Sequence, residues 1–217
     1  MSAVLESNQT TQSVSPTRRG KEIFYPESHD YDMGESTIHY DLISDLIKTL
    51  KLFLASQTDV FIAANLNVYY ENGSPRKWYA PDLMVCFGVS NCHRTVYKLW
   101  EERQFPQVIF EVASKTTWKT DISDKVEDYG RLGAEEYYLL DPENLYLPLP
   151  LMAYRRDETG RLRLVLTENN RVLSPRLNLE IVWENERFRL FDPMAQEFLL
   201  TTEELTAELK KLREKLN

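Results

Sequence analysis

Glycine is scarce in this sequence, with only seven among 217 residues. Nucleotide-binding loops depend on glycines that let the backbone approach phosphate groups closely. No P-loop and no G-x-G-x-x-G pattern occurs, and the hydrolase motifs G-x-S-x-G and H-E-x-x-H are also missing. These absences exclude most nucleotide-dependent classes of enzyme.

Cysteine is scarcer still, because only Cys86 and Cys92 are present. Two cysteines six positions apart, without cysteine or histidine partners at zinc spacing, indicate neither a disulfide framework nor a zinc knot. Cys86 lies in an apolar run and is expected to be a small core residue. The first 22 residues lack the apolar stretch of a signal peptide, and no run reaches membrane-spanning length. We therefore expect a cytoplasmic protein with no membrane partner.

Basic charge is also limited, since 34 acidic residues outnumber 26 Lys and Arg for a net charge of −8. This balance argues against a broad surface that coats nucleic acid, but it leaves room for a local basic groove. The length and the 42% apolar content suit one large domain with an appendage. We expect a disordered tail at 1–22, a domain at 23–200 and a C-terminal helix at 201–217.

What the sequence does contain is a mixture of helical and strand periodicity. The expected helices lie at 35–55, 121–133 and 201–217, and the expected strands at 60–70, 77–89, 107–114 and 135–141. The order strand, helix, strand over 107–141 predicts a crossover with a parallel pair. After residue 150, alternating residues around a turn at 157–160 predict a hairpin, and more short strands are expected at 171–191.

The C-terminal segment begins with Thr201-x-x-Glu204, which is a capping box. Leucines follow at spacings of four, three and four, and form an apolar stripe at Leu205, Leu209, Leu212 and Leu216. The stripe is expected to pack on its own domain. A two-stranded coil with another subunit is the alternative, although two heptads are short.

Two carboxylates occupy strand positions where a core is expected, Asp82 in "APDLMVCFG" and Glu111 in "QVIFEVAS". An ionised carboxylate in a buried strand is costly unless it is paired or binds a metal ion. If the two strands are neighbours, both carboxylates converge on one point, and such oxygen ligands suit Mg²⁺. Taken singly, Asp82 also fits a strand-end residue after Pro81, and Glu111 also fits a partner of an arginine.

A third charged residue, Lys125, lies on the apolar side of the helix at 121–133, in one stripe with Asp121 and Tyr129. It is either a lysine whose head reaches water at the edge of the stripe or a cation beside the two carboxylates. Glu35 and His39 lie one turn apart on the first helix. Glu35 is a helix-cap carboxylate or a third acid of the same site, and His39 is a satisfied core histidine or a proton-handling group at its rim.

The segments "ESTIH", "APDLMVCFGV", "LWEERQFPQVIFEVASKTT", "TDISDKVEDYGRLGAEEYYLLDP" and "RVLSPRLNLEI" resemble, in this order, the bacterial Uma-type restriction endonuclease family. That family is part of the PD-(D/E)XK nuclease superfamily, and the resemblance covers residues 25–205. It implies an α/β fold of the restriction-endonuclease type, with a central mixed sheet flanked by helices, followed here by C-terminal hairpins and a terminal helix.

The resemblance also implies a site and a reaction. Asp82 and Glu111 would be metal ligands for Mg²⁺, or Mn²⁺. Glu35 is the candidate third acid from its place on the first helix. The usual E-x-K lysine would fall at position 113, which is alanine here, and Lys125 matches a lysine that has moved to the next helix. Lys115 is the alternative lysine. The implied reaction is hydrolysis of phosphodiester bonds in DNA by a homodimer.

Three functions follow as hypotheses. The first is a metal-dependent DNA endonuclease with Asp82, Glu111 and Lys125 as its catalytic residues. The second is a nucleic-acid-binding or regulatory protein that keeps the nuclease fold but has little catalytic activity. The third is a small interaction protein that uses the leucine stripe of its C-terminal helix.

Overall fold

The computed structural model describes residues 23–26 and 36–216. The expected tail at 1–22 lies outside the described residues, and so does Glu35. Within the described part, no helix is both long and apolar enough to cross a membrane.

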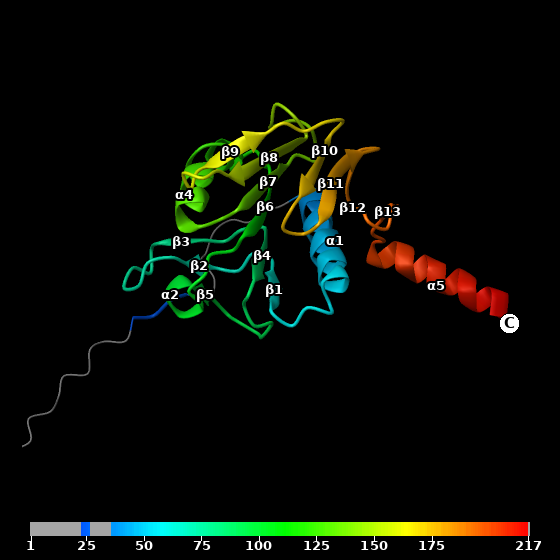
Figure 1. The fold of residues 1–217 in the computed structure, drawn as a ribbon, viewed down its shortest axis with the longest axis horizontal. Helices are drawn as coiled ribbons and strands as arrows, with labels where there is room; N and C mark the ends of the chain where they lie inside the picture. The colour runs from blue at the N-terminus through cyan, green and yellow to red at the C-terminus, as the bar shows by residue number, and fades with distance from the viewer. Residues whose placement is uncertain (1–22, 27–35, 217) are drawn as a thin grey trace, which may run out of the picture.

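A six-stranded mixed sheet forms the centre of the molecule, in the order β1-β4-β6-β7-β8-β9 (Figure 1). Only the β6–β7 pair among these neighbours is parallel, and it confirms the crossover expected from the sequence. The expected hairpin is β8–β9, which turns at residues 157–160. The strands are β1 (Val60–Ala63), β4 (Leu83–Phe87), β6 (Val108–Val112), β7 (Glu136–Leu140), β8 (Leu151–Arg156) and β9 (Leu162–Val165).

Two smaller sheets accompany the central one. The first is four-stranded and antiparallel, in chain order, and comprises β10 (Arg171–Ser174), β11 (Leu179–Glu184), β12 (Arg187–Asp192) and β13 (Glu197–Phe198). The second has the order β3-β2-β5 and comprises β2 (Val68–Tyr69), β3 (Trp78–Tyr79) and β5 (Tyr97–Lys98), with the short helix α2 (Leu99–Glu102) after it.

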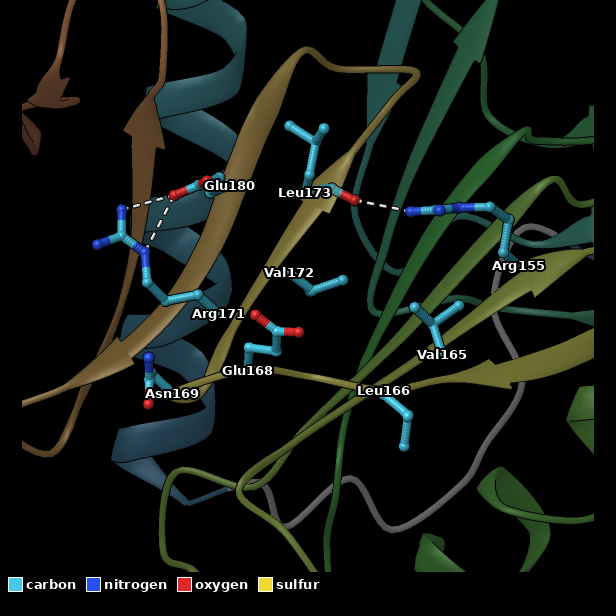
Figure 2. Close-up of a pocket in the computed structure, with 9 residues that line it drawn as sticks. All are labelled: Arg155, Val165, Leu166, Glu168, Asn169, Arg171, Val172, Leu173 and Glu180. Carbon is cyan, nitrogen blue, oxygen red and sulfur yellow. Dashed lines mark hydrogen bonds and ion pairs between the residues drawn. The ribbon is translucent and has the colours of Figure 1, made fainter.

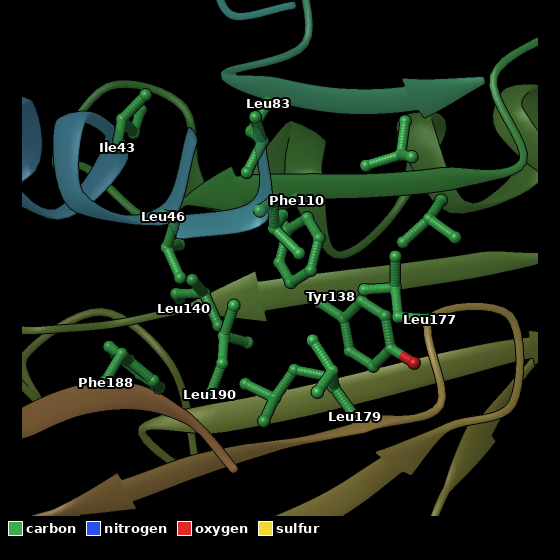
Figure 3. Close-up of a cluster of buried hydrophobic side chains, with 14 of the residues drawn as sticks. Ile43, Leu46, Leu83, Phe110, Tyr138, Leu140, Leu177, Leu179, Phe188 and Leu190 are labelled. Atoms are coloured by element: carbon green, nitrogen blue, oxygen red, sulfur yellow. The ribbon is translucent and has the colours of Figure 1, made fainter. Parts of the chain in front are cut away.

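Helices cover both faces of the central sheet, as the resemblance implied. Helix α1 (Thr37–Phe53) begins at Ser36, whose side chain accepts a hydrogen bond from the His39 amide. It buries Ile43, Leu46 and Leu50 between the central and four-stranded sheets, and Figure 3 shows part of this core. The opposite face is covered by α3 (Trp118–Asp121) and α4 (Asp124–Leu132).

Two expected strands are wrong in their extent. The strand expected at 60–70 is divided between β1 and β2, and the strand expected at 77–89 is divided between β3 and β4. Asn65 adopts a left-handed backbone with φ 51°, which ends the first strand. Pro81 cannot donate a ladder hydrogen bond, and its carbonyl instead accepts one from the Asn65 amide at 3.0 Å. Both breaks lie beside Asp82.

The helix expected at 121–133 is likewise divided, because Ile122 and Ser123 separate α3 from α4. The C-terminal helix α5 (Thr202–Leu216) begins at the expected capping box, in which Thr201 and Glu204 exchange hydrogen bonds of 2.9 and 3.3 Å. Its expected packing on its own domain is confirmed only at its base, where Leu205 is half-buried and lines a groove with Leu52 and Phe53. No residue of α5 is buried, and the helix projects away from the sheets (Figure 1).

A groove of about 390 Å³ lies where strands β8 and β9 approach β10 and β11 (Figure 2). Arg155 donates a 2.8 Å hydrogen bond across it to the carbonyl of Leu173. The polar residues of its lining include Glu168, Arg171 and Glu180. None of the carboxylates or lysines singled out in the sequence lines this groove.

Candidate active site

Strand register brings Asp82 and Glu111 together. Strands β4 and β6 are antiparallel and pair Leu83 with Phe110, and Asp82, at the bend before β4, accepts a hydrogen bond from the Val112 amide next to Glu111. Side chains alternate along a strand, so Glu111 lies on the same face of the sheet as Ile109. On that face, Met84 and Ile109 belong to the cluster beneath α4. Glu111 is only 3% exposed, so its carboxylate lies inside the protein.

The Asp82 carboxylate contacts groups from two elements. Its Oδ2 accepts a 2.7 Å hydrogen bond from the Val112 amide and lies 3.3 Å from Nε2 of His39. The cap at Ser36 fixes the first turn of α1, and this turn carries the buried His39. His39 therefore lies at the rim of the site, where it contacts the carboxylate of Asp82.

Lys125 points inward from α4. Its Nζ lies 3.0 Å from Oε1 of Glu111 and 2.8 Å from Oδ1 of Asp121. The side chain is 15% exposed, so the interpretation of a lysine head directed to water is wrong. Lys115 is exposed in the loop after β6. Of the two lysines considered, Lys125 is the one that contacts the carboxylates.

Asp121 is a member of the cluster to which sequence reasoning gave no role. It ends α3, is fully buried and faces Lys125 across the break between α3 and α4. Within the described part of the chain, its Oδ2 is a buried atom without a hydrogen-bond partner. The four-residue spacing from Lys125 was the available signal, because residues at that spacing are neighbours on a helix.

Two tyrosines fix the cluster from beneath. The Tyr129 hydroxyl, on α4, donates a 2.7 Å hydrogen bond to Oε1 of Glu111. The Tyr137 hydroxyl, on β7, donates a 3.1 Å bond to the backbone carbonyl of Asp121. Both tyrosines are fully buried, and their rings meet edge to face at 5.3 Å. Glu111 and the end of α3 are thus fixed by rigid aromatic groups.

Burial and crowding of like charge set the protonation of the cluster. Burial raises the pKa of Glu111 to about 8, against the lowering effect of Lys125, and the nearby Asp82 and Asp121 raise it further. Burial also raises the pKa of Asp121. For Lys125, burial alone would lower the pKa, but attraction to Glu111 and Asp121 prevails and raises it. One cation thus faces three acids, and Glu111 resists ionisation.

The donor set is compatible with a hard divalent ion. Mg²⁺ is commonly bound through one or two carboxylates and retains several waters. Asp82 and Glu111 supply such a pair, and the unpartnered Oδ2 of Asp121 adds a buried oxygen nearby. Over residues 23–26 and 36–216, no group of three or more His, Cys, Asp or Glu has the arrangement of a complete metal site.

These features define an α/β protein with a buried cluster of acids and one lysine where β4 and β6 meet α4. The sequence profile of the Uma2 family, described as "Putative restriction endonuclease", matches residues 31–190. The match covers most of the chain, and the protein belongs to this family. It confirms the resemblance found in the sequence.

Comparison with solved structures gives a similar protein, described as a "putative nuclease belonging to DUF820" from Anabaena variabilis ATCC 29413. The two chains are 13% identical, the TM-score is 0.48, and the alignment covers 66% of this chain and 75% of the other. No curated protein matches this sequence.

Proposed function

We propose that this protein is an endonuclease that hydrolyses phosphodiester bonds in DNA with the help of a divalent metal ion. Its family is one of restriction-endonuclease-like proteins, which supports a nuclease. The observation that carries the proposal is that Asp82 and Glu111 lie close together at the end of the paired strands β4 and β6, with the ammonium of Lys125 3.0 Å from Glu111. Buried carboxylates are costly unless a cation completes them.

Asp82 and Glu111 would hold the ion, and Glu35, which lies outside the described residues, would be a third acid. A bound Mg²⁺ or Mn²⁺ would polarise a phosphate oxygen and lower the pKa of a water molecule. The protein orients the ligands in advance. The Val112 amide and His39 fix Oδ2 of Asp82, and Tyr129 fixes Oε1 of Glu111.

Lys125 would stabilise the negative charge that develops on the phosphate during hydrolysis. Its raised pKa keeps the ammonium charged at neutral pH, so it acts as a fixed cation. Asp121 holds it at 2.8 Å, close to the end of β6. Asp121 is therefore a positioning residue, since it acts through Lys125.

Plasmid cleavage with Mg²⁺ or Mn²⁺ tests the proposal, with wild type compared with Asp82→Asn and Glu111→Gln. Both substitutions keep the size of the side chain, and an amide oxygen at position 82 can still accept from the Val112 amide. We expect both variants to lose cleavage and to weaken Mn²⁺ binding measured by calorimetry. The matched control is Glu127→Gln on α4, where the native side chain is exposed. Full activity of both site variants would contradict the proposal.

The second candidate function is nucleic-acid binding or regulation by a nuclease fold with little catalysis. It is favoured by one observation, that Lys125 already neutralises part of the acidic cluster by bridging Glu111 and Asp121. In that case wild type would bind DNA without binding Mn²⁺ or cleaving it. Calorimetry with Mn²⁺ alone, in the absence of DNA, separates the two candidates.

A further inference from the structure

The three outer leucines of the α5 stripe are exposed in the described part of the chain. Leu209 and Leu212 are 57% and 55% exposed, and Leu216 is 87% exposed. The base of the helix is anchored through the capping box and through Arg189, which donates a 2.7 Å hydrogen bond to Glu204. An amphipathic helix with an exposed row of leucines needs another apolar surface to exclude water from that row.

An apolar groove lies at the base of the same helix. Its volume is about 570 Å³, and it is formed between the end of α1, β13 and the first turns of α5. The apolar part of its lining comprises Leu52, Phe53, Phe198, Leu199, Leu200 and Leu205. Leu205 is the first leucine of the stripe, so the groove and the stripe form one continuous apolar surface.

Charge is segregated along α5. The half nearest the domain, 202–208, carries three acids and no base: Glu203, Glu204 and Glu208. The outer half, 209–216, carries four bases and one acid, the bases being Lys210, Lys211, Arg213 and Lys215. Acids of neighbouring elements add to the inner half. Glu197 also lines the groove, where its acids outnumber the base Arg189, which pairs with Glu204. Burial together with Glu203 raises the pKa of Asp45 on α1.

The basic half cannot reach the acidic base of its own helix. Residues 202–216 form one continuous helix, which is rigid and about 22 Å long, and it leaves the domain directly from the capped first turn. A second copy of the chain, related by a twofold axis, can bring its basic half to this acidic region. Its basic half would lie against the acidic half of the first copy, and the reverse would hold at the same time.

We infer that α5 is a dimerisation helix, which pairs antiparallel with α5 of a second copy and inserts its outer end into the groove at that copy's base. In this register Leu205 faces Leu216 of the second copy, and Leu209 faces Leu212 of the second copy. The same register sets Glu208 opposite Lys215 of the second copy, twice by symmetry. A parallel pair would instead bring the two acidic halves together and set Glu208 near Arg213 of the second copy.

Sedimentation velocity over a range of protein concentration tests the inference, and it is independent of whether the protein cleaves DNA. Wild type should be a dimer, and its dissociation constant should rise with added salt. Leu209→Glu combined with Leu212→Glu should raise the dissociation constant about 100-fold or more, because apolar contacts on both copies are lost. The native leucines are exposed, so the variant should keep its circular dichroism spectrum. A monomeric wild type, or a double variant that dimerises as well as wild type, would overturn the inference.

Charge exchange tests the direction of the helices. Glu208→Lys alone and Lys215→Glu alone should each weaken the dimer, and the two together should restore it. Rescue of Glu208→Lys by Arg213→Glu, without rescue by Lys215→Glu, would establish a parallel pair and overturn the antiparallel one. Glu214→Lys is the matched control, because residue 214 lies on the side of the helix away from the leucines and its substitution should leave the dimer intact.

Discussion

Two regions of this protein depart from ordinary burial in opposite directions. Beneath α4, charged groups lie inside: Glu111 and Asp121 are buried, and Lys125 is nearly so. Along α5, leucines lie outside. Each arrangement is unfavourable by itself, because buried charge loses its hydration and exposed leucine orders water.

The two regions differ in how many contact partners the same chain supplies to them. The acidic cluster has internal partners, since Lys125, Tyr129 and the Val112 amide contact its carboxylates. The outer leucines of α5 lie on a helix without a single buried residue. We therefore expect substitutions in the cluster to alter folding and chemistry together, and substitutions in α5 to alter association alone.

Removal of the lysine should have the largest effect. Lys125→Met leaves Glu111 and Asp121 buried beside each other without their cation, and breaking a buried ion pair in this way costs about 3–5 kcal/mol of stability. Under the proposed function, cleavage should also slow by about 2–4 kcal/mol of barrier, as for a lost charge-stabilising donor. Urea denaturation and plasmid cleavage measure the two effects.

Lys115→Met is the matched control for this prediction. Lys115 is exposed, so its loss should leave stability within about 0.5 kcal/mol of wild type and should mainly weaken DNA binding. If Lys115→Met abolished cleavage while Lys125→Met retained it, the assignment of the lysine would be wrong.

The pH dependence of stability should reveal the buried Glu111. Its pKa is raised from an ordinary value of 4.5 to about 8, so between these values the folded protein keeps a proton that the unfolded chain has released. Stability contributed by this group is therefore complete below about pH 4.5 and declines as pH rises toward about 8. In EDTA, the melting temperature of wild type should fall across this window more steeply than that of Glu111→Gln. Parallel pH curves for the two proteins would contradict this account.

A single hydroxyl should have a smaller effect. Tyr129→Phe removes the 2.7 Å hydrogen bond to Oε1 of Glu111 and keeps the aromatic ring. The expected loss is about 1–2 kcal/mol, because Lys125 still contacts the same oxygen. Urea denaturation measures it, and Tyr154→Phe is the matched control, since Tyr154 is also a buried tyrosine of the same core cluster. An equal loss in both variants would show that the Glu111 contact has no special value.

Much of the fold could be predicted from local patterns. The helical periodicity of residues 35–55, the crossover over 107–141 and the capping box at Thr201 are short-range features, and the structure contains all three. The breaks within 60–70 and 77–89 depend on Asn65 and Pro81, whose backbones meet in a tertiary hydrogen bond. The periodicity of side chains along a strand carries no information about such a tertiary contact. The sequence therefore predicts one continuous strand in each of these two segments.

Part of the site could also be predicted from local sequence patterns. Asp82 and Glu111 stand out because each interrupts an apolar run, and Lys125 because it lies on an apolar face. Asp121 does not stand out, since an acid near a helix start is ordinary, and its burial follows from how α3 packs on β7. The exposure of α5 was missed because an apolar stripe indicates that a helix needs a partner and not which chain supplies it.

The smallest effect on folding is expected in α5. Leu209→Glu exchanges one exposed leucine for a charged residue on a helix without buried residues, so the stability of a dilute sample should change by less than about 0.5 kcal/mol. Leu46→Glu is the contrasting variant, because Leu46 is 4% exposed in the core beneath α1 and an unpaired charge there should prevent folding. Urea denaturation at low protein concentration, where any dimer has dissociated, measures the free energy of unfolding of the monomer alone. A large loss in Leu209→Glu under these conditions would mean that α5 folds back onto its own domain in solution. The exposed leucines would then belong to the domain's core after all, and the contrast between the two regions would disappear.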